Sequence, residues 1–247
     1  MEAVIEDAKL FKNCIDAIVS LVSEGSFVVS DQGFQLRTMD PSQIAMVDFI
    51  FPKSAFGKLQ ADSETTLGLN LTDLSKILNR TRPNEKLTLS LQEKESRLVL
   101  EFAGAGKRSF KMPLLDIGGS LPREPKIQFD AMVKMRGRAL KDLLHDAGLL
   151  SSHVVLETKE KQLIVEAHGD SGDLRTEMNA GGEVKEVKTN AEARAMFPFE
   201  YLDNMTRACP DDAEVELSLK SNAPIRLTYN IGPAKLTYYL APRVETA

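Results

Sequence analysis

Cysteine is scarce in this sequence, and the few cysteines cannot stabilise a fold through disulfide bonds. Only Cys14 and Cys209 occur among 247 residues, far apart and outside any C-x-x-C pair. Two such residues exclude a disulfide framework and provide no zinc or thiol-redox motif. The sequence therefore favours a reducing compartment, and we expect no metal and no cofactor.

Long hydrophobic runs are also absent. No stretch of eighteen apolar residues is free of charge, and the first thirty residues contain acidic side chains and no uninterrupted apolar core of a signal peptide. We therefore expect a protein that is neither secreted nor membrane-spanning. It would be cytoplasmic, or nuclear if its source is eukaryotic.

Catalytic signatures are missing as well. The three histidines, His145, His153 and His168, do not occur at the i, i+4 spacing of a helical metal pair. There is no Gly-x-Ser-x-Gly elbow, and the acidic pairs have no candidate base nearby. Residues 104–109 are rich in glycine but lack two positions of a phosphate-binding loop, so they are interpreted as a hairpin turn. We predict that the protein is not an enzyme.

The composition is that of an ordinary globular protein. Hydrophobic residues make up 43% of the chain and charged residues 27%, and the length allows one or two domains with a large core. Lysine and arginine number 31 against 36 acidic residues, which gives a net charge of −5. A role in nucleic-acid binding therefore requires basic residues to gather on one surface.

The hydrophobic pattern repeats four times, with a period of about fifty to sixty residues. Each unit has the order strand, helix and three strands, which predicts an α+β protein of two similar domains built from β-α-β-β-β units. The expected helices are 9–22, a short helix after an N-cap at Thr72, 138–147 and 199–208. The expected strands are 26–30, 34–39, 44–51, 65–71, 86–91, 97–102, 107–114, 130–135, 154–158, 162–168, 174–180, 194–197, 215–220, 224–229 and 234–240.

Two segments interrupt this pattern. Residues 116–125 contain two glycines and two prolines with few large apolar side chains, which is typical of an exposed linker. We predict domains at 1–116 and 127–247, joined by a linker at 117–126. Residues 181–193 are charged and lack large apolar side chains, so we expect a mobile loop there.

Basic side chains lie on the polar faces of all four expected helices. Each alone is an ordinary solvated residue, but together they provide what a sequence-independent contact with a phosphate backbone requires. These faces lack aromatic residues, which disfavours single-strand binding. We expect the acidic residues mainly on the opposite, sheet-covered side. The candidate DNA-facing residues are Lys9, Lys12, Lys76, Arg80, Arg138, Lys141 and Arg207.

A second candidate surface is apolar. Residues 39–46 join two expected strands, and further apolar residues occur in the linker and in residues 241–244. Ordinary packing explains each of these alone. A methionine-bearing apolar groove also accepts short peptide helices and extended segments.

Four segments together resemble the proliferating cell nuclear antigen family, the sliding clamps of archaeal and eukaryotic DNA replication. They are residues 69–78 (LNLTDLSKIL), 37–40 (RTMD), 132–135 (MVKM) and 236–245 (LTYYLAPRVE). The last is the most specific, and the resemblance covers essentially the whole chain. It implies a DNA-clamp fold in which three identical subunits form a ring, with helices inside and antiparallel sheets outside.

The resemblance also implies a function in which the protein catalyses no reaction. The ring would encircle duplex DNA regardless of sequence and tether DNA polymerase and other replication and repair proteins, conferring processivity. The implied partners are PIP-box proteins such as DNA polymerase, flap endonuclease and DNA ligase, and the clamp loader, replication factor C. Lys12, Lys76 and Arg207 match DNA-facing positions of the family. At other such positions the chain departs from the common lysines and arginine, with Asn13, Val19, Asn79 and His145.

Two further surfaces are implied by the resemblance. Subunits of the family join by pairing edge strands, which here match 107–114 and 173–180, and partner peptides dock in a pocket between the two domains. The interface residues would be Lys107, Arg108, Phe110, Met112, Leu174, Arg175, Glu177 and Met178. The peptide pocket would be Met39, Ile44, Met46, Leu121, Pro122, Pro224, Ala241, Pro242 and Arg243.

Three alternatives stay open at this point. The chain could be one subunit of a heterotrimeric clamp, a peptide-binding scaffold that does not encircle DNA or, least favoured, a hydrolase with an unrecognised site. The short tail and compact loops are more similar to archaeal than to eukaryotic members of the family. An archaeal clamp would be associated with the nucleoid.

Overall fold

The computed structural model describes residues 1–61, 63–118 and 121–243. The chain divides into two compact units that are not contiguous in sequence. Unit 1 comprises Met1–Pro41, Val47–Pro122 and Ile231–Leu236, and unit 2 comprises Ser42–Met46, Arg123–Asn230 and the chain from Thr237 on. The predicted domain boundaries stay a prediction. Gly119, Ser120, Val244 and Glu245, which the sequence interpretation used, lie outside the described residues.

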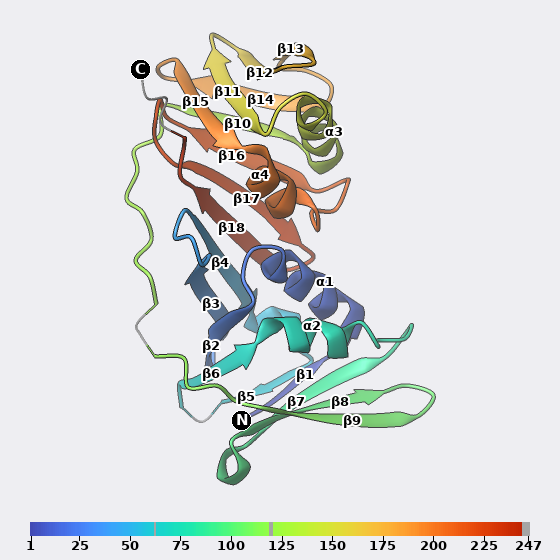
Figure 1. Ribbon diagram of the computed structural model, residues 1–247. Coiled ribbons are helices and arrows are strands. Elements are labelled where there is room, and N and C mark those ends of the chain that lie inside the picture. Colours follow the sequence, from blue (N-terminus) through green and yellow to red (C-terminus); the bar gives the residue numbers. More distant parts are fainter. Residues whose placement is uncertain (62, 119–120, 244–247) are drawn as a thin grey trace. The chain divides into compact units, whose positions relative to one another are not determined.

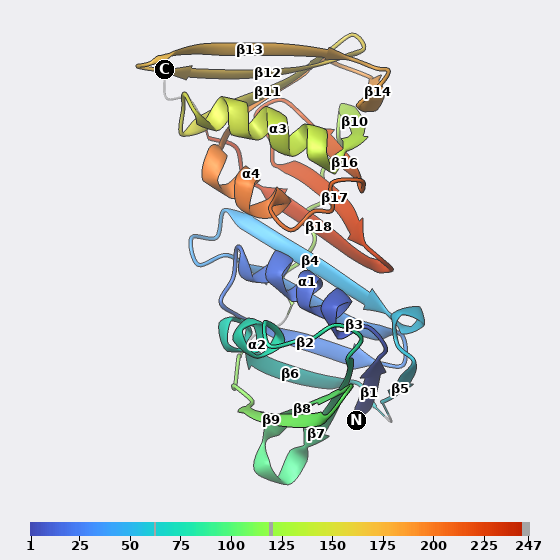
Figure 2. The same ribbon diagram turned by 90° about the vertical axis from the view of Figure 1, so that its right-hand side faces the viewer.

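Unit 1 contains two β-α-β-β-β repeats. The first consists of β1 (Glu2–Ile5), α1 (Ala8–Val19), β2 (Glu24–Ser30), β3 (Gly33–Met39) and β4 (Ala45–Pro52). The second consists of β6 (Thr65–Asn70), α2 (Leu71–Leu78), β7 (Lys86–Gln92), β8 (Arg97–Ala103) and β9 (Lys107–Pro113), and β5 (Lys58–Gln60) lies between the repeats. The strands form antiparallel sheets in the orders β5-β1-β7-β8-β9 and β4-β3-β2-β6. In Figures 1 and 2, α1 and α2 lie side by side and cover one face of the strands.

Unit 2 repeats this arrangement. Its first repeat is β10 (Ala131–Arg136), α3 (Gly137–Gly148), β11 (His153–Lys159), β12 (Gln162–Gly169) and β13 (Gly172–Asn179). Its second is β15 (Ala193–Pro198), α4 (Phe199–Thr206), β16 (Glu214–Leu219), β17 (Ile225–Ile231) and β18 (Ala234–Leu240), with β14 (Val184–Thr189) between them. The strand orders are β14-β10-β16-β17-β18 and β13-β12-β11-β15. The predicted α+β class and fourfold repeat are therefore confirmed.

The helices form where the sequence places an apolar stripe beside a capping residue. In α1, Phe11, Cys14 and Ile15 are buried, and the Asp7 side chain accepts hydrogen bonds from the backbone N–H groups of Lys9 and Leu10. Such a cap satisfies donors that have no partner within the helix. The Phe11 ring packs edge-on against Phe51 of β4, with centroids 5.4 Å apart, which holds α1 against the strands.

The second helix begins earlier than predicted. Thr72 is not its N-cap, because Asn70 has that role: its side-chain oxygen accepts the backbone N–H of Asp73 at 2.8 Å. Strand β6 ends at Asn70 and the helix starts at the next residue, Leu71, which is fully buried. The prediction was wrong because a buried leucine, rather than a polar turn, occupies the first helical position.

The charged segment after β13 is not simply a loop. Residues Val184–Thr189 form β14, which pairs antiparallel with β10, so the expected mobile loop is corrected to an edge strand. Val184 and Val187 are buried, although their spacing of three breaks the alternation of a regular strand. A bulge opposite Lys134 and Met135 shifts the register between them, and a bulge of this kind inserts one extra residue. The sequence pattern also gave no sign of β1 and β5.

The linker begins against unit 1. The backbone N–H of Leu115 donates to the carbonyl of Gly68 in β6 at 2.8 Å, and a Cβ atom on Gly68 would lie 2.1 Å from the Leu115 carbonyl oxygen. Only glycine permits so close an approach of two backbones. Further along, the Tyr239 hydroxyl of β18 donates to Glu124 at 2.6 Å, which ties the second half of the linker to unit 2.

Both cysteines are free and buried, and burial raises the pKa of each thiol to about 12. Across residues 1–61, 63–118 and 121–243, no cluster of histidine, cysteine or acidic side chains could hold a metal ion. No helix in that part of the chain is long and apolar enough to cross a membrane.

Candidate nucleic-acid interface and partner surfaces

The predicted DNA-facing residues lie on α1, α2 and α3 or, for Arg80 and Arg207, just after the ends of α2 and α4. Lys9, Lys76, Arg80, Arg138 and Arg207 are exposed, whereas Lys12 and Lys141 are partly buried. The apolar faces of these helices pack on the sheets, so their polar faces are left for solvent or a ligand. The structure thus places a cation in α1, α2 and α3, and in the fourth repeat the cation Arg207 follows directly after α4.

Carboxylates of unit 1 lie directly beside two of these cations. Lys12 Nζ is 2.5 Å from Asp16 Oδ2 one turn along α1, and Lys76 Nζ is 2.9 Å from Asp73 Oδ1 in α2. The second oxygen of Asp16 accepts the Ser75 hydroxyl at 3.0 Å, which joins α1 to α2. Lys12 is therefore held in a contact between the helices and is less available to a phosphate than Lys76.

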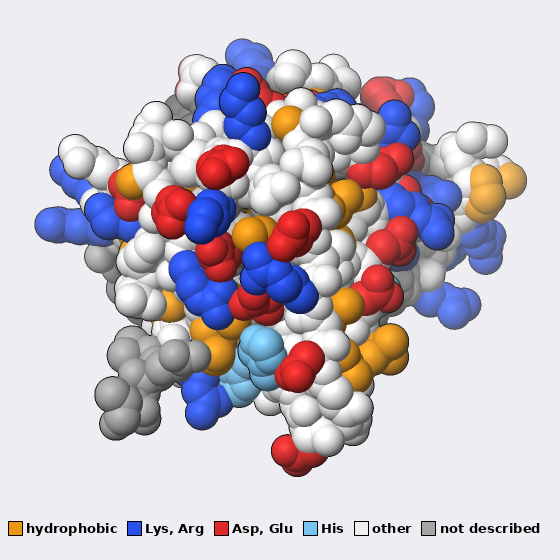
Figure 3. All heavy atoms as spheres, turned by 90° about the horizontal axis from the view of Figure 1, so that it is seen from above, with side chains coloured by type: hydrophobic (Ala, Val, Ile, Leu, Met, Phe, Trp, Pro, Cys, Tyr) orange, Lys and Arg blue, Asp and Glu red, His pale blue; other side chains and the backbone are white. Residues whose placement is uncertain are grey.

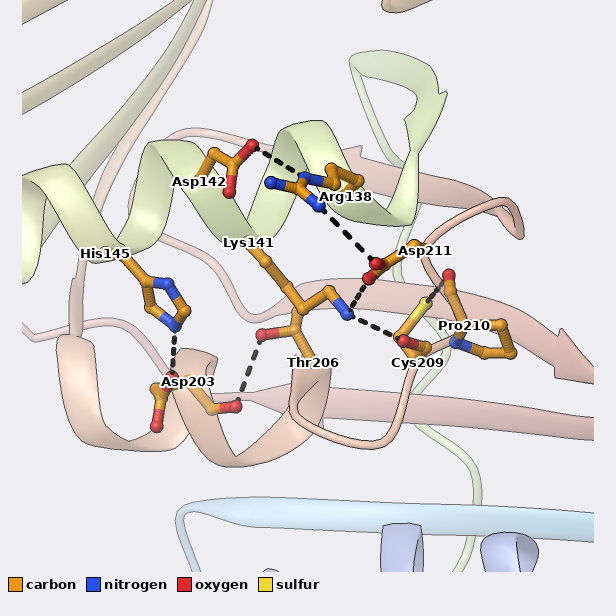
Figure 4. Close-up of polar contacts among 9 residues, drawn as sticks. All are labelled: Arg138, Lys141, Asp142, His145, Asp203, Thr206, Cys209, Pro210 and Asp211. Carbon is orange, nitrogen blue, oxygen red and sulfur yellow. Dashed lines mark hydrogen bonds and ion pairs between the residues drawn. The ribbon is translucent and has the colours of Figure 1, made fainter.

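Unit 2 has a denser polar cluster, shown in Figure 4. Lys141 is 19% exposed, and its ammonium donates to the Cys209 carbonyl at 2.9 Å and to Asp211 at 2.5 Å. These contacts tie α3 to the loop that follows α4. The ion pair with Lys141 holds the pKa of Asp211 below its usual value. Lys141 therefore has a structural role that the sequence prediction did not include.

The other cations of unit 2 are exposed but also paired. Arg138 Nε lies 3.4 Å from Asp142 and its Nη1 lies 3.8 Å from Asp211. Arg207 Nη2 lies 2.7 Å from Asp203. The other oxygen of Asp203 is 3.3 Å from His145 Nε2, as Figure 4 shows. The arrangement brings His145, from α3, and Arg207, from the end of α4, to one carboxylate.

The expectation that acidic residues lie mainly on the sheet-covered side stays a prediction, but carboxylates also lie directly beside the helix cations. Five of the seven predicted cations have a carboxylate partner on the helices or the adjoining loop. Among the described residues, the side chains of Lys9 and Arg80 have no ion pair. Exposed pairs of this kind contribute little to stability, but they lower the positive potential that a phosphate meets.

The two predicted interface strands are both sheet edges. Strand β9 is the last strand of its sheet in unit 1, and β13 is the last of its sheet in unit 2. Both alternate between exposed and half-buried residues, with Met112 the only fully buried one. One face of each strand carries apolar side chains, Phe110 and Met112 in β9 and Leu174 and Met178 in β13. The other face carries charge, Lys107 and Lys111 in β9 and Asp173, Arg175 and Glu177 in β13.

Arg108, one of the predicted interface residues, is held by several polar contacts within unit 1. Its Nη2 contacts both oxygens of Glu85, at 2.8 and 2.6 Å, and its Nη1 donates to the Arg80 carbonyl at 3.0 Å. The guanidinium also stacks 5.2 Å from the centre of the Phe102 ring. These contacts fix the start of β9 against the chain that follows α2.

The predicted peptide pocket draws on residues of both units. In unit 2, the Ala241 N–H donates to the Ile44 carbonyl at 2.8 Å, so residues nearly two hundred apart in sequence lie together. Ile44, Pro224, Ala241 and Pro242 are half-buried and Arg243 is exposed, but Met46 is only 2% exposed and supports the surface from beneath. In unit 1, Met39, Leu121 and Pro122 are half-buried.

Comparison with known proteins shows the family. The family model described as "Proliferating cell nuclear antigen, N-terminal domain" matches residues 1–118, and the model of its C-terminal domain matches residues 123–244. The chain belongs to the proliferating cell nuclear antigen family. A DNA polymerase sliding clamp of Thermofilum pendens is 32% identical over 98% of both chains, and DNA polymerase sliding clamp 1 of Pyrobaculum aerophilum is 34% identical over 97% of this chain and 96% of its own.

Solved structures agree. The A. fulgidus member of the family, solved with the C-terminal region of FEN-1 bound, is 28% identical and superposes with a TM-score of 0.90 over 100% of this chain and 99% of that one. These matches confirm the predicted family, the two-domain clamp fold and the function of a sliding clamp, together with the non-enzymatic role that this function carries.

The acidic residues that modulate these surfaces were not among the predicted site residues. Asp16, Asp73, Asp203 and Asp211 lie beside the helix cations, and Glu85 holds Arg108. The i, i+4 spacing of Lys12 with Asp16 and of Asp203 with Arg207 was a readable signal. The contacts of Lys141 and Arg108 join residues 70 and 23 positions apart and left no such signal.

Proposed function

We propose that three copies of this chain close head to tail into a ring that encircles duplex DNA and tethers replication and repair proteins. The observation that carries the proposal is the fourfold β-α-β-β-β repeat, which places a cation on or directly after the helix of every repeat and leaves β9 and β13 as sheet edges. Edge strands need cover, and pairing between copies removes them. A head-to-tail contact that closes on itself gives a ring.

The two edges match each other chemically. Each has an apolar row and a charged row, and the charged row of β9 is basic whereas that of β13 carries two acidic residues and one arginine. Pairing β9 of one copy with β13 of the next would place apolar side chains together and opposite charges together. Arg108 contributes indirectly, because its contacts within unit 1 fix β9. The proposed direct contacts are Lys107, Phe110, Met112, Leu174, Arg175, Glu177 and Met178.

The dimensions allow DNA inside such a ring. Three copies supply twelve helices, and helices about 10 Å across, side by side, set their axes on a circle about 38 Å wide. The hole is then about 28 Å, wider than a duplex. The proposed contacts are Lys9, Lys12, Lys76, Arg80, Arg138, Lys141 and Arg207. Because most of these cations are already paired, each phosphate contact is weak, which suits a clamp that must slide.

For partner binding, we propose that a PIP-box peptide lies on the surface formed by Met39, Ile44, Leu121, Pro122, Pro224, Ala241, Pro242 and Arg243, with Met46 beneath. The similar A. fulgidus protein holds the C-terminal region of FEN-1, which supports this. DNA polymerase, DNA ligase and the clamp loader are the other expected partners. A tether of this kind raises the local concentration of an enzyme at the DNA. The protein would act in the cytoplasm, at the nucleoid.

The deciding experiment uses DNA topology. The protein is loaded onto nicked circular DNA by a clamp loader, and the DNA is then linearised with a restriction enzyme during gel filtration. We expect co-elution with the circle and release from the linear form, because topology and not affinity holds a ring. The same DNA blocked at both ends by bound protein should retain the clamp. Equal retention on unblocked linear and circular DNA would contradict the proposal.

A further inference from the structure

Unit 2 contains a pocket that shares only Arg243 with the proposed peptide surface. It has a volume of about 430 Å³ and is lined by Val155, Ala195 and Met196 on one side and by Arg194, Ser221, Asn222 and Arg243 on the other. Its floor is the face of the sheet on which Val155 pairs with Met196. Its rim is the C-terminal segment, whose Arg243 N–H donates to the Met196 carbonyl at 2.8 Å. The pocket is therefore half apolar and half polar.

The arginine of the sheet is neutralised by its neighbours. Arg194 Nη1 lies 2.6 Å from both Glu157 and Glu166, and Glu166 also pairs with Arg175, which in turn contacts Glu177. In this network of ion pairs, two arginines interact with three carboxylates. Figure 3 looks onto this end of unit 2 and shows basic and acidic side chains interspersed over the surface. Arg194 therefore adds no net positive charge to the pocket.

Arg243 differs, because no carboxylate of the described residues pairs with it. Its guanidinium contacts the His153 ring, with Nη1 2.7 Å from Nε2, and within residues 1–61, 63–118 and 121–243 it has no carboxylate partner. Ser152 is the other group on that ring, with its hydroxyl 3.0 Å from Nδ1. Burial, and then the charge of Arg243, hold the pKa of His153 below its usual value, so the imidazole is neutral at pH 7. The pocket thus has at its rim a cation that no carboxylate in the described part of the chain neutralises.

The polar side of the pocket is shaped by the turn between β16 and β17. Asn222 has a φ of 51°, in the left-handed region that asparagine tolerates better than most residues. Its backbone N–H donates to the Arg194 carbonyl at 3.2 Å, and the Ser221 hydroxyl accepts the Arg194 N–H at 3.1 Å. Two residues later comes Pro224, which belongs to the proposed peptide surface. The turn therefore connects that surface to the pocket.

We infer that this pocket is a subsite for an acidic side chain of the bound partner peptide, with Arg243 pairing with the carboxylate and Val155 and Met196 covering the methylene groups. The inference rests on the proposed function, because the peptide surface supplies the ligand. Charge complementarity selects a carboxylate over a basic or neutral side chain. The apolar floor favours glutamate, whose stem is longer than that of aspartate.

The test uses fluorescein-labelled PIP-box peptides in which a single glutamate is moved through the flanking residues, each matched by the same peptide with glutamine. Fluorescence anisotropy measures Kd for the wild type, and at one position we expect glutamate to bind about three- to fivefold more tightly than glutamine. Arg243→Gln should abolish this preference. Asn222→Asp, which keeps a side chain suited to the turn, should reverse it.

Arg136→Gln is the matched control, because Arg136 is an exposed arginine of unit 2 that pairs with Glu183 and does not line the pocket. It should leave the preference unchanged. No glutamate preference at any position, or a preference that survives Arg243→Gln, overturns the subsite. Tighter binding of both peptides after removal of residues 244–247 would show that the chain's own tail is the occupant, which also overturns it. If no peptide binds the wild type at all, the proposed function itself fails.

Discussion

At the scale of single residues, one buried carboxylate organises a corner of unit 1. Glu85 is 4% exposed and accepts Arg108 through both oxygens and the Arg82 backbone N–H at 2.8 Å. Burial acts to raise the pKa of Glu85, but the Arg82 hydrogen bond and the Arg108 ion pair outweigh it and hold the pKa below the usual 4.5. Since Arg108 belongs to β9, this carboxylate connects the chain after α2 to a proposed subunit edge.

Glu85→Ala should lower the free energy of unfolding by about 2–3 kcal/mol, because it leaves Arg108 and the Arg82 N–H without their partner. The loss should depend on pH. A carboxylate whose pKa is lowered by folding stabilises the fold above its unfolded pKa, and this contribution is lost as the pH falls through its folded pKa. Chemical denaturation at pH 7 and pH 4 measures both effects, and the variant should differ from the wild type more at pH 7.

The control for this prediction is Glu95→Ala. Glu95 is exposed, and its pair with Lys111 spans 3.7 Å, so its removal should change the free energy of unfolding by less than about 0.5 kcal/mol. Equal effects of the two substitutions would mean that Glu85 contributes no more than a surface pair.

At the scale of elements, helix starts and sheet edges are where the sequence was least informative. A β6 strand that runs directly into α2 has no polar turn to mark the boundary, and β14 has an irregular pattern because of its bulge. The hairpin between β8 and β9, in contrast, was predicted correctly, since Gly104 and Gly106 lie between two strands in register. A regular alternation of apolar and polar residues can be recognised in a sequence, whereas an interruption of that alternation cannot.

Asn70→Ala tests the corrected start of α2. Loss of the cap should cost about 1 kcal/mol, which for a chain of this size lowers Tm by about 2–4 °C. Thr72→Ala is the matched control and should be nearly neutral, because Thr72 does not cap the helix. Thermal unfolding followed by circular dichroism measures both variants. A larger effect of Thr72→Ala would restore the N-cap that the sequence suggested.

At the scale of the whole molecule, the proposed ring depends on two edge strands that contribute little to their own units. Strand β13 has no fully buried residue, so its side chains can be changed with little effect on the core. In a ring, however, its half-buried apolar row would be covered by the next copy. Substitutions on the two faces of β13 should therefore separate assembly from folding.

Leu174→Asp should convert a trimer of about 82 kDa into the 27.3 kDa monomer, because a carboxylate without a partner in an apolar contact is costly to bury. Sedimentation equilibrium measures the mass, and circular dichroism should show an unchanged fold. Asp173→Asn, on the opposite face of the same strand, should stay trimeric. A Leu174→Asp variant that keeps the mass of three chains would place the subunit contact elsewhere.

The sequence by itself determined the repeat, the buried faces of the helices, the hairpin after β8 and the family. Each of these depends on residues close together along the chain, or on a segment such as residues 236–245 that is read as a string. Hydrophobic periodicity carries such information because the period of a helix or strand is fixed by backbone geometry.

Only the tertiary structure decided which cations are free. Distances of a few ångströms between distant segments decide whether Lys141 is free for a phosphate or pairs with Asp211. They also decide whether Arg108 is free for a neighbouring subunit or pairs with Glu85, and whether Arg243 has a carboxylate partner. Ion pairing falls off over such distances, and the sequence does not specify them. The same holds for the meeting of Ile44 with Ala241 and for the pocket beside Arg243, which exist because the fold brings remote backbone segments together.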